Sequence, residues 1–461
     1  MLAVYHKISG RFSFTEPADI AFEDEAYLVG VFGTALQPLD KGFAAHAAGC
    51  AAADLYRSFD GPFLLLVYVK ADRRLVIRQS FFGSPVNLWL AENDEALVLS
   101  DSLRLLRQQL RRRFVFNAQV LPQFLYNGFV KGSGTLIRHI GKLPPSCLLR
   151  LSRDGISFAP DRPVFAPYSG DLSLEERYCE LVRAAVERAA GSPSEACHIT
   201  LSAGFDSNCI LWHIRRLFPE KPVKAYSVGG IRGVDETGTA KKIASYYGNV
   251  SFSSSLVTAE TLTHMDEIVS RLEGSVYERG IFLQYELGRL LTGSGCQRII
   301  CGECADQVFH SRLFDKAPED TFFFDYSHHP YEMASYVVLR KNITMMRSMG
   351  VAVEYPFLDS ELLRLGYDTR GMNGATKEFH KAMCRRLLPE NVMALVSKQG
   401  GTTDMAALFD DKTDYARQAR KFRFYDPGFE ITRRFPPDEA RRDYYLTLAY
   451  LESFCKQFTD E

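Results

Sequence analysis

The first 165 residues carry short runs of β-branched, aromatic and aliphatic residues, and Gly, Pro and Asp interrupt these runs. Runs of this kind are typical of strands that pair through tight turns. The pattern therefore predicts a region of paired antiparallel strands. The runs that define it are AYLVGVFG, FLLLVYV, RLVIRQSFFG, ALVLSD and SCLLRLSRDGISF.

The pattern changes at residues 158–171, FAPDRPVFAPYSGD, which are rich in Pro and end in Gly and Asp. Because Pro and Gly break both strand and helix patterns, we place a linker and the domain boundary here. Ser173 followed by Glu176 has the capping-box signature, so a helix of about five turns should begin directly after it. The predicted domains are residues 1–165 and 172–461.

Strands alternate with helices in the second domain. HITLS at 198–202, KAYSVGG at 224–230 and QRIICG at 297–302 have the apolar character of buried strands, while SNCILWHIRRLF and KKIASYYG have helical character. Alternation of this kind predicts an α/β fold with a doubly wound parallel sheet. The last 60 residues, rich in Arg, Tyr and Phe, are expected to be mostly helical.

Composition narrows the class of protein. Of the 461 residues, 46% are hydrophobic and 24% charged, as in ordinary soluble chains. The formal net charge of -1 provides no global positive field for nucleic acid or an anionic membrane. The apolar stretch PFLLLVYV is only strand-length, so neither a signal peptide nor a membrane span is expected.

The ten cysteines are scattered, and only Cys301 and Cys304 form a C-x-x-C pair. Free thiols in a reducing cytoplasm are the expectation. The pair could be half of a metal or redox site, but buried small residues are favoured because no second pair accompanies it. The basic cluster RQQLRRRF at 107–114 is expected to form a solvated edge or an interdomain face.

The most informative segment runs from Ser202 to Ser207, SAGFDS, where a buried strand gives way to a helix N-terminus. Unpaired backbone N–H groups and the helix dipole at such a junction bind anions, which favours a phosphate site over an ordinary turn. The G-x-x-x-x-G-K-[ST] loop is absent from the sequence, so γ-phosphate kinase or GTPase chemistry is disfavoured.

LSAGFDS resembles the SGGxDS loop of ATP-pyrophosphatases, which cleave ATP between its α and β phosphates. Further segments resemble the asparagine synthetase family in the same order: YSVGG, ICGECADQVF, EYPFLDSELL and TKEFHKAMCRRLLPENVMALVSKQG. FDGPFLLLVYVKADRRLVIRQSFFGSPVNLWL is similar to part of the family's glutaminase domain. The resemblance implies an N-terminal glutaminase-like αββα sandwich of the Ntn type and a C-terminal ATP-pyrophosphatase domain.

The resemblance also implies roles for individual residues. Asp206 and Asp306 would hold Mg²⁺ against the pyrophosphate, and such hard oxygen ligands suit that ion. Lys398 would be the catalytic lysine, Lys377 a second phosphate-facing lysine, and Glu303 the group that orients the substrate or accepts the amine's proton. Residues that would bind ATP are Ser202, Gly204 and Ser207 at the pyrophosphate and Leu201, Val228, Cys301 and Gly302 at the adenosine.

Departures from the family pattern are equally informative. Glutamine-hydrolysing members have a cysteine after Met1, whereas this sequence begins Met1-Leu2-Ala3 and has no cysteine before Cys50. The family's glutamine-binding Asp is replaced by Ser80, so the glutaminase-like domain is expected to be inactive. Ala203 replaces a loop glycine, which could tighten or shift the loop.

A degenerate glutaminase domain makes the chain similar to the β-lactam synthetase branch, in which the substrate supplies its own amine. The function that this resemblance implies is an ATP- and Mg²⁺-dependent ligase that forms AMP and pyrophosphate and closes a lactam, in specialised metabolism such as antibiotic biosynthesis. The substrate would be a small amino-diacid or a peptide that carries both a carboxylate and an amine. No nucleic acid or membrane partner is expected, and the protein could form a homodimer.

Three alternatives stay open. A peptide substrate would make the enzyme a lasso-type macrolactam cyclase. Glu303 stands where β-lactam-forming members have a tyrosine, which favours an ammonia-dependent asparagine synthetase-like enzyme; Glu332, Tyr326 and Tyr331 are candidates for a substitute acid–base pair. A non-catalytic scaffold is the third, although it would have no need for Asp206, Asp306 and Lys398.

Overall fold

The computed structural model describes residues 1–16, 20–152, 155–165, 168–230, 236–315, 329–396, 415–426, 428–429 and 437–460. They form two compact units. Unit 1 consists of Met1–Ala166, Glu273–Ser275 and Phe454–Glu461, and unit 2 consists of Pro167–Leu272 and Val276–Ser453. The chain first passes from one unit to the other inside the linker predicted from the sequence. The two later segments of unit 1 have no counterpart in the sequence-based division.

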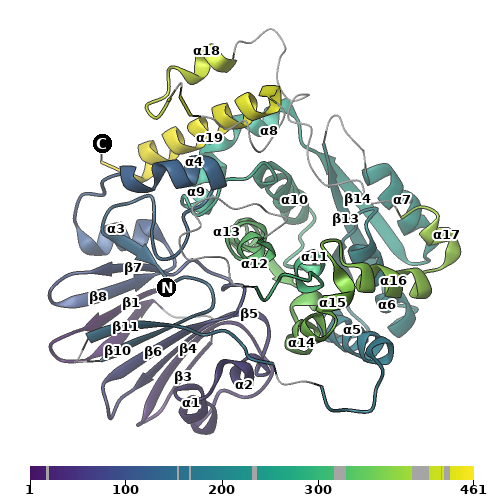
Figure 1. Ribbon diagram of the computed structural model, residues 1–461, viewed down its shortest axis with the longest axis horizontal. Helices are drawn as coiled ribbons and strands as arrows, with labels where there is room; N and C mark the ends of the chain where they lie inside the picture. Colours follow the sequence, from purple (N-terminus) through teal and green to yellow (C-terminus); the bar gives the residue numbers. More distant parts are fainter. Residues whose placement is uncertain are drawn as a thin grey trace. The chain divides into compact units, whose positions relative to one another are not determined.

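Unit 1 contains two antiparallel sheets (Figure 1). The five-stranded sheet has the order β2 (Phe12–Glu16), β1 (Leu2–His6), β8 (Ala96–Ser100), β7 (Trp89–Glu92), β9 (Ile140–Lys142). The six-stranded sheet has the order β11 (Gly155–Pro160), β10 (Cys147–Ser152), β6 (Arg74–Gln79), β5 (Phe59–Val69), β4 (Tyr27–Ala35), β3 (Ile20–Glu23). The antiparallel pairing predicted from the sequence is thus present.

The core of unit 1 lies between the two sheets. Alternate residues of a strand face the same side, and Leu64, Leu66 and Tyr68 of β5 pack in one cluster with Leu97 and Leu99 of β8. Full burial of one such side chain contributes about 1.5–3 kcal/mol. On the outer faces, α1 (Lys41–Ala47) and α2 (Ala52–Tyr56) pack on β4 and β5, and α3 (Leu103–Leu110) packs on β7 and β8. The unit therefore has four layers, helix, sheet, sheet, helix.

Two acidic residues from the later segments complete unit 1. Glu273 accepts hydrogen bonds from Ser102 Oγ (2.9 Å) and the Leu103 N–H (2.8 Å), where a carboxylate suits the N-terminus of α3. Asp460 accepts a hydrogen bond from the Phe114 N–H (2.7 Å) and pairs with Arg107. The basic cluster at 107–114 thus has an acidic partner within its own unit.

The sequence misplaced the start of the linker and missed β1. Residues 158–160 pair with Leu149, Leu148 and Cys147, so they end β11 instead of beginning a linker. Backbone pairing overrides the turn tendency of Pro160 at this sheet edge. Strand β1 is flanked by the polar sequence HKISG and lies between β2 and β8, a pairing that its short apolar run did not reveal.

Unit 2 contains a five-stranded parallel sheet, which confirms the predicted fold class for this part of the chain. Its order is β14 (Val250–Leu256), β13 (Val223–Gly229), β12 (Cys197–Thr200), β15 (Arg298–Ile300), β16 (Ala352–Glu354). The strand order reverses between β12 and β15, and ligands bind at such a switch point in open α/β sheets, beyond the carboxyl ends of the strands.

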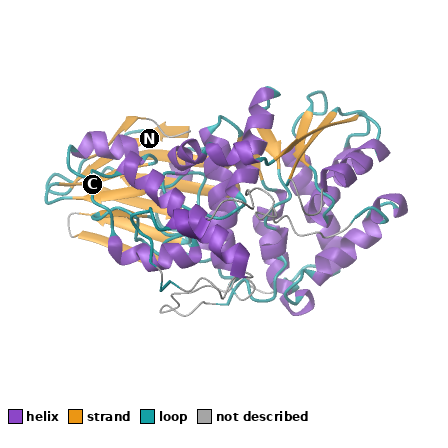
Figure 2. Ribbon diagram, turned by 90° about the horizontal axis from the view of Figure 1, so that it is seen from above, coloured by secondary structure: helices purple, strands orange, loops and turns teal. Residues whose placement is uncertain are grey.

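Helices flank this sheet (Figure 2). The predicted helix after the linker is α5 (Leu174–Ala190), and Ser173 and Glu176 form the expected capping box. Helix α6 (Phe205–Leu217) packs on α5, α7 (Glu236–Tyr246) packs on β13 and β14, and α10 (Ile281–Gly293) packs on α13 (Leu339–Ser348). Helices α7 and α10 both contact β13 and β14, α6 contacts β12, and α13 contacts β16.

The remaining helical segments are short except for the last. They are 3₁₀ segments at Ala118–Val120 and Pro356–Leu358, a π segment at Met333–Val338, α4 (Leu121–Asn127), α8 (Ala259–Thr263), α9 (Met265–Leu272), α11 (Ala305–Val308), α12 (Pro330–Glu332), α14 (Ser360–Asp368), α15 (Arg370–Asn373), α16 (Glu378–Leu387), α17 (Glu390–Met393), α18 (Tyr415–Ala419) and α19 (Pro437–Phe458). The described part of the last 60 residues is mainly helical, as expected.

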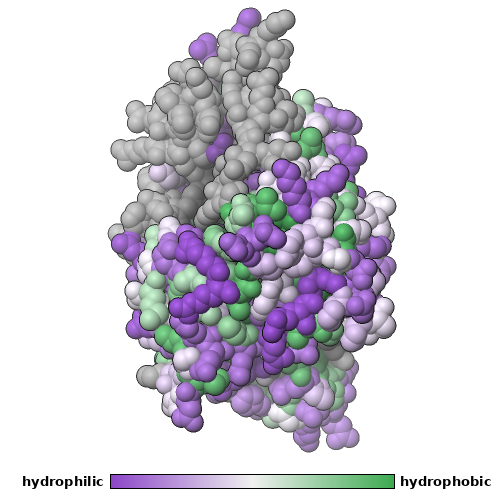
Figure 3. Space-filling model, turned by 90° about the vertical axis from the view of Figure 1, so that its right-hand side faces the viewer, coloured by the Kyte–Doolittle hydropathy of each residue, from purple (hydrophilic) through white to green (hydrophobic). Residues whose placement is uncertain are grey.

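Within the described residues, every helix is too short or too polar to cross a membrane. Figure 3 views the molecule from the side on which α7 and α17 lie in Figure 1. Over the described part of this face, hydrophobic residues are interspersed with hydrophilic ones.

Candidate functional site

The loop from β12 to α6 is closed by its own polar groups. The Ser202 N–H donates to Ser207 Oγ (3.1 Å), and the Gly204 N–H donates to Ser202 Oγ (3.1 Å). Asn208 Nδ2 donates to the carbonyl oxygens of Ser202 (3.0 Å) and Gly204 (2.7 Å). Gly204 has φ -79°, and Ala203 is not among the described residues with positive φ. The substitution by alanine therefore causes no backbone strain.

Gly302, two residues after the end of β15, allows this strand end to approach the loop. A Cβ atom at this position would lie 2.9 Å from the Ser207 nitrogen and 3.1 Å from the Asp206 carbonyl carbon. Both distances are shorter than ordinary van der Waals contact, and both atoms belong to the backbone of α6. Only glycine fits at Gly302 without moving the first turn of α6, because it alone lacks a Cβ.

A cavity of about 330 Å³ lies at this switch point. Eleven of the site residues predicted from the sequence line it: Leu201, Ser202, Gly204, Asp206, Ser207, Val228, Cys301, Gly302, Glu303, Asp306 and Lys377. The twelfth, Lys398, lies outside the described residues. Lining residues that sequence reasoning missed are Thr200, Phe205, Tyr226, Ser227, Glu236, Leu283, Gln284, Leu287 and Asn342. The cavity thus brings together residues from the ends of three strands, β12, β13 and β15, and from α10 and α13.

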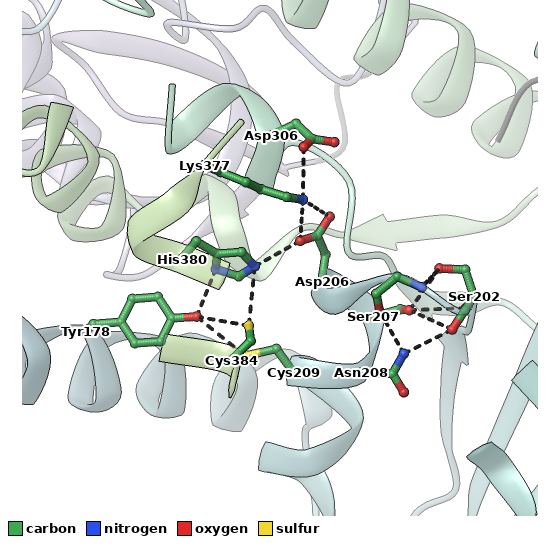
Figure 4. Close-up of polar contacts among 11 residues, drawn as sticks. Tyr178, Ser202, Asp206, Ser207, Asn208, Cys209, Asp306, Lys377, His380 and Cys384 are labelled. Carbon is green, nitrogen blue, oxygen red and sulfur yellow. Dashed lines mark hydrogen bonds and ion pairs between the residues drawn. The ribbon is translucent and has the colours of Figure 1, made fainter. Parts of the chain in front are cut away.

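Lys377 connects the two carboxylates of the cavity (Figure 4). Its Nζ lies 2.6 Å and 2.5 Å from the two carboxylate oxygens of Asp206 and 3.0 Å from Oδ1 of Asp306. Although burial opposes both charges, the ammonium holds the pKa of Asp206 well below its usual range, and the carboxylates raise the pKa of Lys377. Both groups are therefore charged across the physiological pH range.

His380 and Tyr178 lie behind Asp206, and the sequence did not identify either. His380 Nε2 is 2.9 Å from Asp206 Oδ1, and its Nδ1 is 2.9 Å from the Tyr178 hydroxyl. Cys209 and Cys384 lie near that hydroxyl, at 3.6 and 3.9 Å. The available signal was the short spacing between Lys377, directly before α16, and His380 in its first turn.

Glu303 also lines the cavity, but its pKa is shifted in the opposite direction to that of Asp206. Burial raises its pKa, and the neighbouring Lys341 ammonium lowers it by less. Lys341 is itself ion-paired with Glu278. Glu303 therefore takes up a proton more readily than an ordinary glutamate, a property suited to accepting a proton.

The two cysteines of the C-x-x-C pair are buried, and burial raises the pKa of both thiols, that of Cys301 to about 12. Thiols of high pKa are poor nucleophiles. Cys301 lines the cavity, and Cys304 is not among the lining residues. Cys304 has φ 74°, a left-handed conformation that favours glycine. Glycine would fit this backbone better than cysteine does.

Gln284 of α10 presents a buried amide oxygen that has no hydrogen-bond partner in the described structure, and its side chain lines the cavity. An unpaired buried acceptor costs about 1–3 kcal/mol. A ligand that supplies a donor here would recover this cost.

Other candidates from the sequence lie elsewhere. Tyr331 and Glu332 are buried but are not among the residues that line the cavity, and Tyr326 lies outside the described residues. Asp359 of the PFLD segment caps α14 and pairs with Arg188, so its role is structural.

The donor chemistry fits Mg²⁺. Asp206 and Asp306 offer carboxylate oxygens at the edge of the cavity, where Mg²⁺ takes one or two protein carboxylates and completes its coordination with phosphate oxygens and water. No group of three or more His, Cys, Asp or Glu residues in the described part of the chain is placed to hold a metal by protein ligands alone. The residues present suit an ion that arrives with a phosphate-containing ligand.

The fold and the site define a mixed α/β protein with a polar cavity at the switch point of a parallel sheet. Residues 177–335 match the asparagine synthase family model, and this region contains Asp206, Glu303 and Asp306. The chain is 25% identical over 183 residues to asparagine synthetase [glutamine-hydrolyzing] 2 of Oryza sativa subsp. japonica, covering 37% of this chain and 30% of that relative.

Three solved structures have low overall similarity. The U34-tRNA thiolase of Methanococcus maripaludis has a TM-score of 0.24 and 14% identity, covering 46% of this chain and 80% of the other. The NMN synthetase of Francisella tularensis has a TM-score of 0.23 and 12% identity, covering 39% of this chain and 94% of the other. The glutamine-dependent NAD+ synthetase of Acinetobacter baumannii has a TM-score of 0.21 and 18% identity, covering 42% of this chain and 44% of the other.

Proposed function

We propose that the protein is an ATP-dependent ligase that activates a substrate carboxylate as an acyl-adenylate and forms an amide, closing a lactam within one substrate molecule. The observation that carries this proposal is the contact of one buried ammonium, Lys377, with both Asp206 and Asp306 at the mouth of the Ser202–Ser207 loop. The match of residues 177–335 to the asparagine synthase family supports it.

The loop would hold the phosphates of ATP. The N-terminus of α6 presents backbone N–H groups, and the Ser202 and Ser207 hydroxyls lie beside them. Lys377 supplies a fixed positive charge that stabilises negative charge as pyrophosphate departs. Asp206 and Asp306 would hold Mg²⁺, which would neutralise phosphate charge when bound.

The reaction then has two steps. A carboxylate oxygen of the substrate attacks the α-phosphorus, the bond to pyrophosphate breaks, and an acyl-adenylate forms. An amine attacks the acyl carbon and forms the C–N bond. The bond between the acyl carbon and the AMP oxygen breaks, AMP leaves, and the amine nitrogen loses a proton. Glu303 lines the cavity and has a raised pKa, which suits it to orient the substrate or accept that proton. The role of Lys398 as the catalytic lysine stays a prediction.

Features of unit 1 favour an amine supplied by the substrate. The sequence has no cysteine before Cys50, and the residues at the start of β1 are apolar and buried. Ser80, at the position of the family's glutamine-binding Asp, is buried and donates its hydroxyl to the Gly83 carbonyl. A glutaminase-like domain with Ser80 engaged in this way would have no free group at this position for glutamine.

An ammonia-dependent asparagine synthetase-like activity is the second candidate. Glu303 favours it, since asparagine synthetases have glutamate at this position. A peptide substrate, and with it a macrolactam product, is compatible with the same two-step chemistry.

The test is ATP–pyrophosphate exchange with Mg²⁺ and a panel of carboxylates: aspartate with and without ammonia, amino-diacids, and peptides containing Asp or Glu. Exchange with an amino-diacid or peptide in the absence of ammonia, together with loss of one water from the product mass, is the expected result. Exchange with aspartate alone, and a product that requires ammonia, would favour the second candidate. No exchange with any of these classes would contradict both.

A further inference from the structure

We propose that His380 is a positioning residue for Asp206, and that Tyr178 fixes the hydrogen-bonding direction of His380. The proposal rests on the proposed function, in which Asp206 would hold Mg²⁺ against the phosphates of ATP. It goes further by naming a buried hydrogen-bond chain, from Tyr178 through His380 to Asp206, that sets the orientation of one carboxylate in the cavity (Figure 4).

The contacts are satisfied when His380 donates to Asp206 and accepts from Tyr178. Asp206 is an acceptor when ionised, so His380 Nε2 must carry the proton that it donates to Oδ1, 2.9 Å away. In the neutral imidazole, Nδ1 then accepts from the Tyr178 hydroxyl, also 2.9 Å away. The imidazole thus gives Asp206 a second contact, beside the ion pair with Lys377.

The two carboxylate oxygens of Asp206 have different surroundings. Oδ1 is held by both His380 Nε2 (2.9 Å) and Lys377 Nζ (2.6 Å), whereas Oδ2 is held by Lys377 at 2.5 Å. A hydrogen bond from a rigid ring therefore restricts rotation of the carboxylate about χ2. The orientation of Asp206 would persist when Lys377 turns its charge toward a bound phosphate.

The imidazole is held rigidly by its packing. His380 is fully buried, stacked on the Phe309 ring at 5.2 Å and 16° and edge-on to the Phe357 ring at 5.2 Å and 90°. Tyr178 is also fully buried, and burial raises the pKa of its hydroxyl well above the usual value. The hydroxyl is therefore protonated and available as a donor. A ring flip of His380 would break both hydrogen bonds at once.

A histidine that served only to fill the core would pack equally well without its hydrogen bonds. A leucine at 380 would then be tolerated at the site, and stability alone would change. A substitution that keeps a hydrogen-bond donor at the position of Nε2 therefore distinguishes a positioning role from a packing role. Glutamine can place an amide N–H near the position of Nε2, whereas leucine cannot.

The experiment measures equilibrium binding of α,β-methylene ATP with Mg²⁺ by calorimetry, for the whole chain and its variants. His380→Leu should weaken binding by about 10–100-fold, the usual effect of removing a group that orients a ligating carboxylate. His380→Gln should regain most of the affinity. Cys384→Ala is the matched control, because its Sγ lies 3.6 Å from the same Nε2 without linking the ring to Asp206; it should bind as the wild type does.

Wild-type affinity in His380→Leu, or folded His380→Gln no better than His380→Leu, would overturn the proposal. Circular dichroism establishes folding. Tyr178→Phe conserves the volume and serves where His380→Leu does not fold; weakened binding supports the chain and unchanged binding contradicts it.

A second readout needs neither metal nor nucleotide. Long-range ¹H–¹⁵N spectra of the free protein should show the His380 proton on Nε2 and none on Nδ1, and a proton on Nδ1 would overturn the proposed chain. If the wild type fails to bind the ATP analogue, the proposed function fails while this spectrum still decides the arrangement of His380.

Discussion

Lys377 and Asp206 lie 171 residues apart in the sequence, yet the Lys377 Nζ contacts both Asp206 carboxylate oxygens, at 2.6 and 2.5 Å. Lys377 adopts φ 53° immediately before α16, so the backbone turns sharply at the residue that enters the cavity. A left-handed conformation costs a non-glycine residue about 1–2 kcal/mol. The ion pairs with Asp206 and Asp306 offset that cost.

Replacing Lys377 by Met should reduce ATP–pyrophosphate exchange by about 10²–10³-fold, because a preorganised charge at the departing pyrophosphate is lost. Lys381→Met is the matched control: Lys381 is on α16, which Lys377 directly precedes, and pairs with Glu378 at 3.1 Å. Steady-state exchange rates at saturating substrate check this. Equal rates for the two variants would contradict the role given to Lys377.

Glu303→Gln should separate the two chemical steps. Pyrophosphate exchange should persist, while product formation falls by about 10²–10⁴-fold if Glu303 accepts the amine's proton. Glu236→Gln is the control, because Glu236 also lines the cavity and burial raises its pKa. Product formation measured by mass spectrometry should be reduced in the first variant and kept in the second.

The same Glu303→Gln variant should be more stable at neutral pH. A carboxyl whose pKa is raised in the folded state binds its proton more tightly there than in the unfolded chain. The protein therefore loses stability as the pH rises from the ordinary pKa of this group through its pKa in the folded state. Glutamine removes this loss. The melting temperature should exceed that of the wild type at pH 7, and the gain should shrink below about pH 4.3, the ordinary glutamate pKa. A gain that does not depend on pH would be inconsistent with this explanation.

Asp161→Ala should destabilise unit 1 by about 3–5 kcal/mol, because it leaves the buried Arg78 guanidinium without its carboxylate. Arg78 donates to both Asp161 oxygens, at 2.9 and 2.7 Å, and both side chains are buried. Glu23→Ala removes the exposed pair with Lys70 and should cost about 1 kcal/mol or less. Urea unfolding followed by circular dichroism compares them, and similar losses would show that the buried pair is unimportant.

Cys304→Gly should be more stable than Cys304→Ala by about 1 kcal/mol, the reverse of the usual order. Both variants lose the same sulfur, but only glycine relieves the left-handed φ of 74°. Ala305→Gly, at the adjacent helical position, should instead be destabilising by about 0.5–1 kcal/mol. Thermal unfolding of the three variants tests the assignment of strain to Cys304.

Gln284→Met should stabilise the free protein and weaken nucleotide binding. Methionine conserves the volume, and it removes an unpaired buried oxygen that costs about 1–3 kcal/mol. Thermal unfolding with and without the ATP analogue measures both effects. A variant that is no more stable than the wild type in the absence of ligand would show that the amide is satisfied in solution.

The sequence by itself determined the elements that depend on local pattern. Ser173 and Glu176 predicted the start of α5, and strand–helix alternation predicted the parallel sheet, because capping and hydrophobic period are properties of neighbouring residues. The SAGFDS motif identified the loop that lines the cavity. Residue type and strand-end position were sufficient for these inferences.

Only the tertiary structure decided how distant residues meet. Tyr178, Asp206 and His380 come from three separate helices, and nothing in their local sequences marks the hydrogen bonds between them. Glu273 and Asp460 likewise join unit 1 from far along the chain. Such contacts depend on chain topology and on the exclusion of water, which give buried polar groups a strong preference for one partner. Local sequence encodes neither quantity, and so the positioning of Asp206 emerged only from the fold.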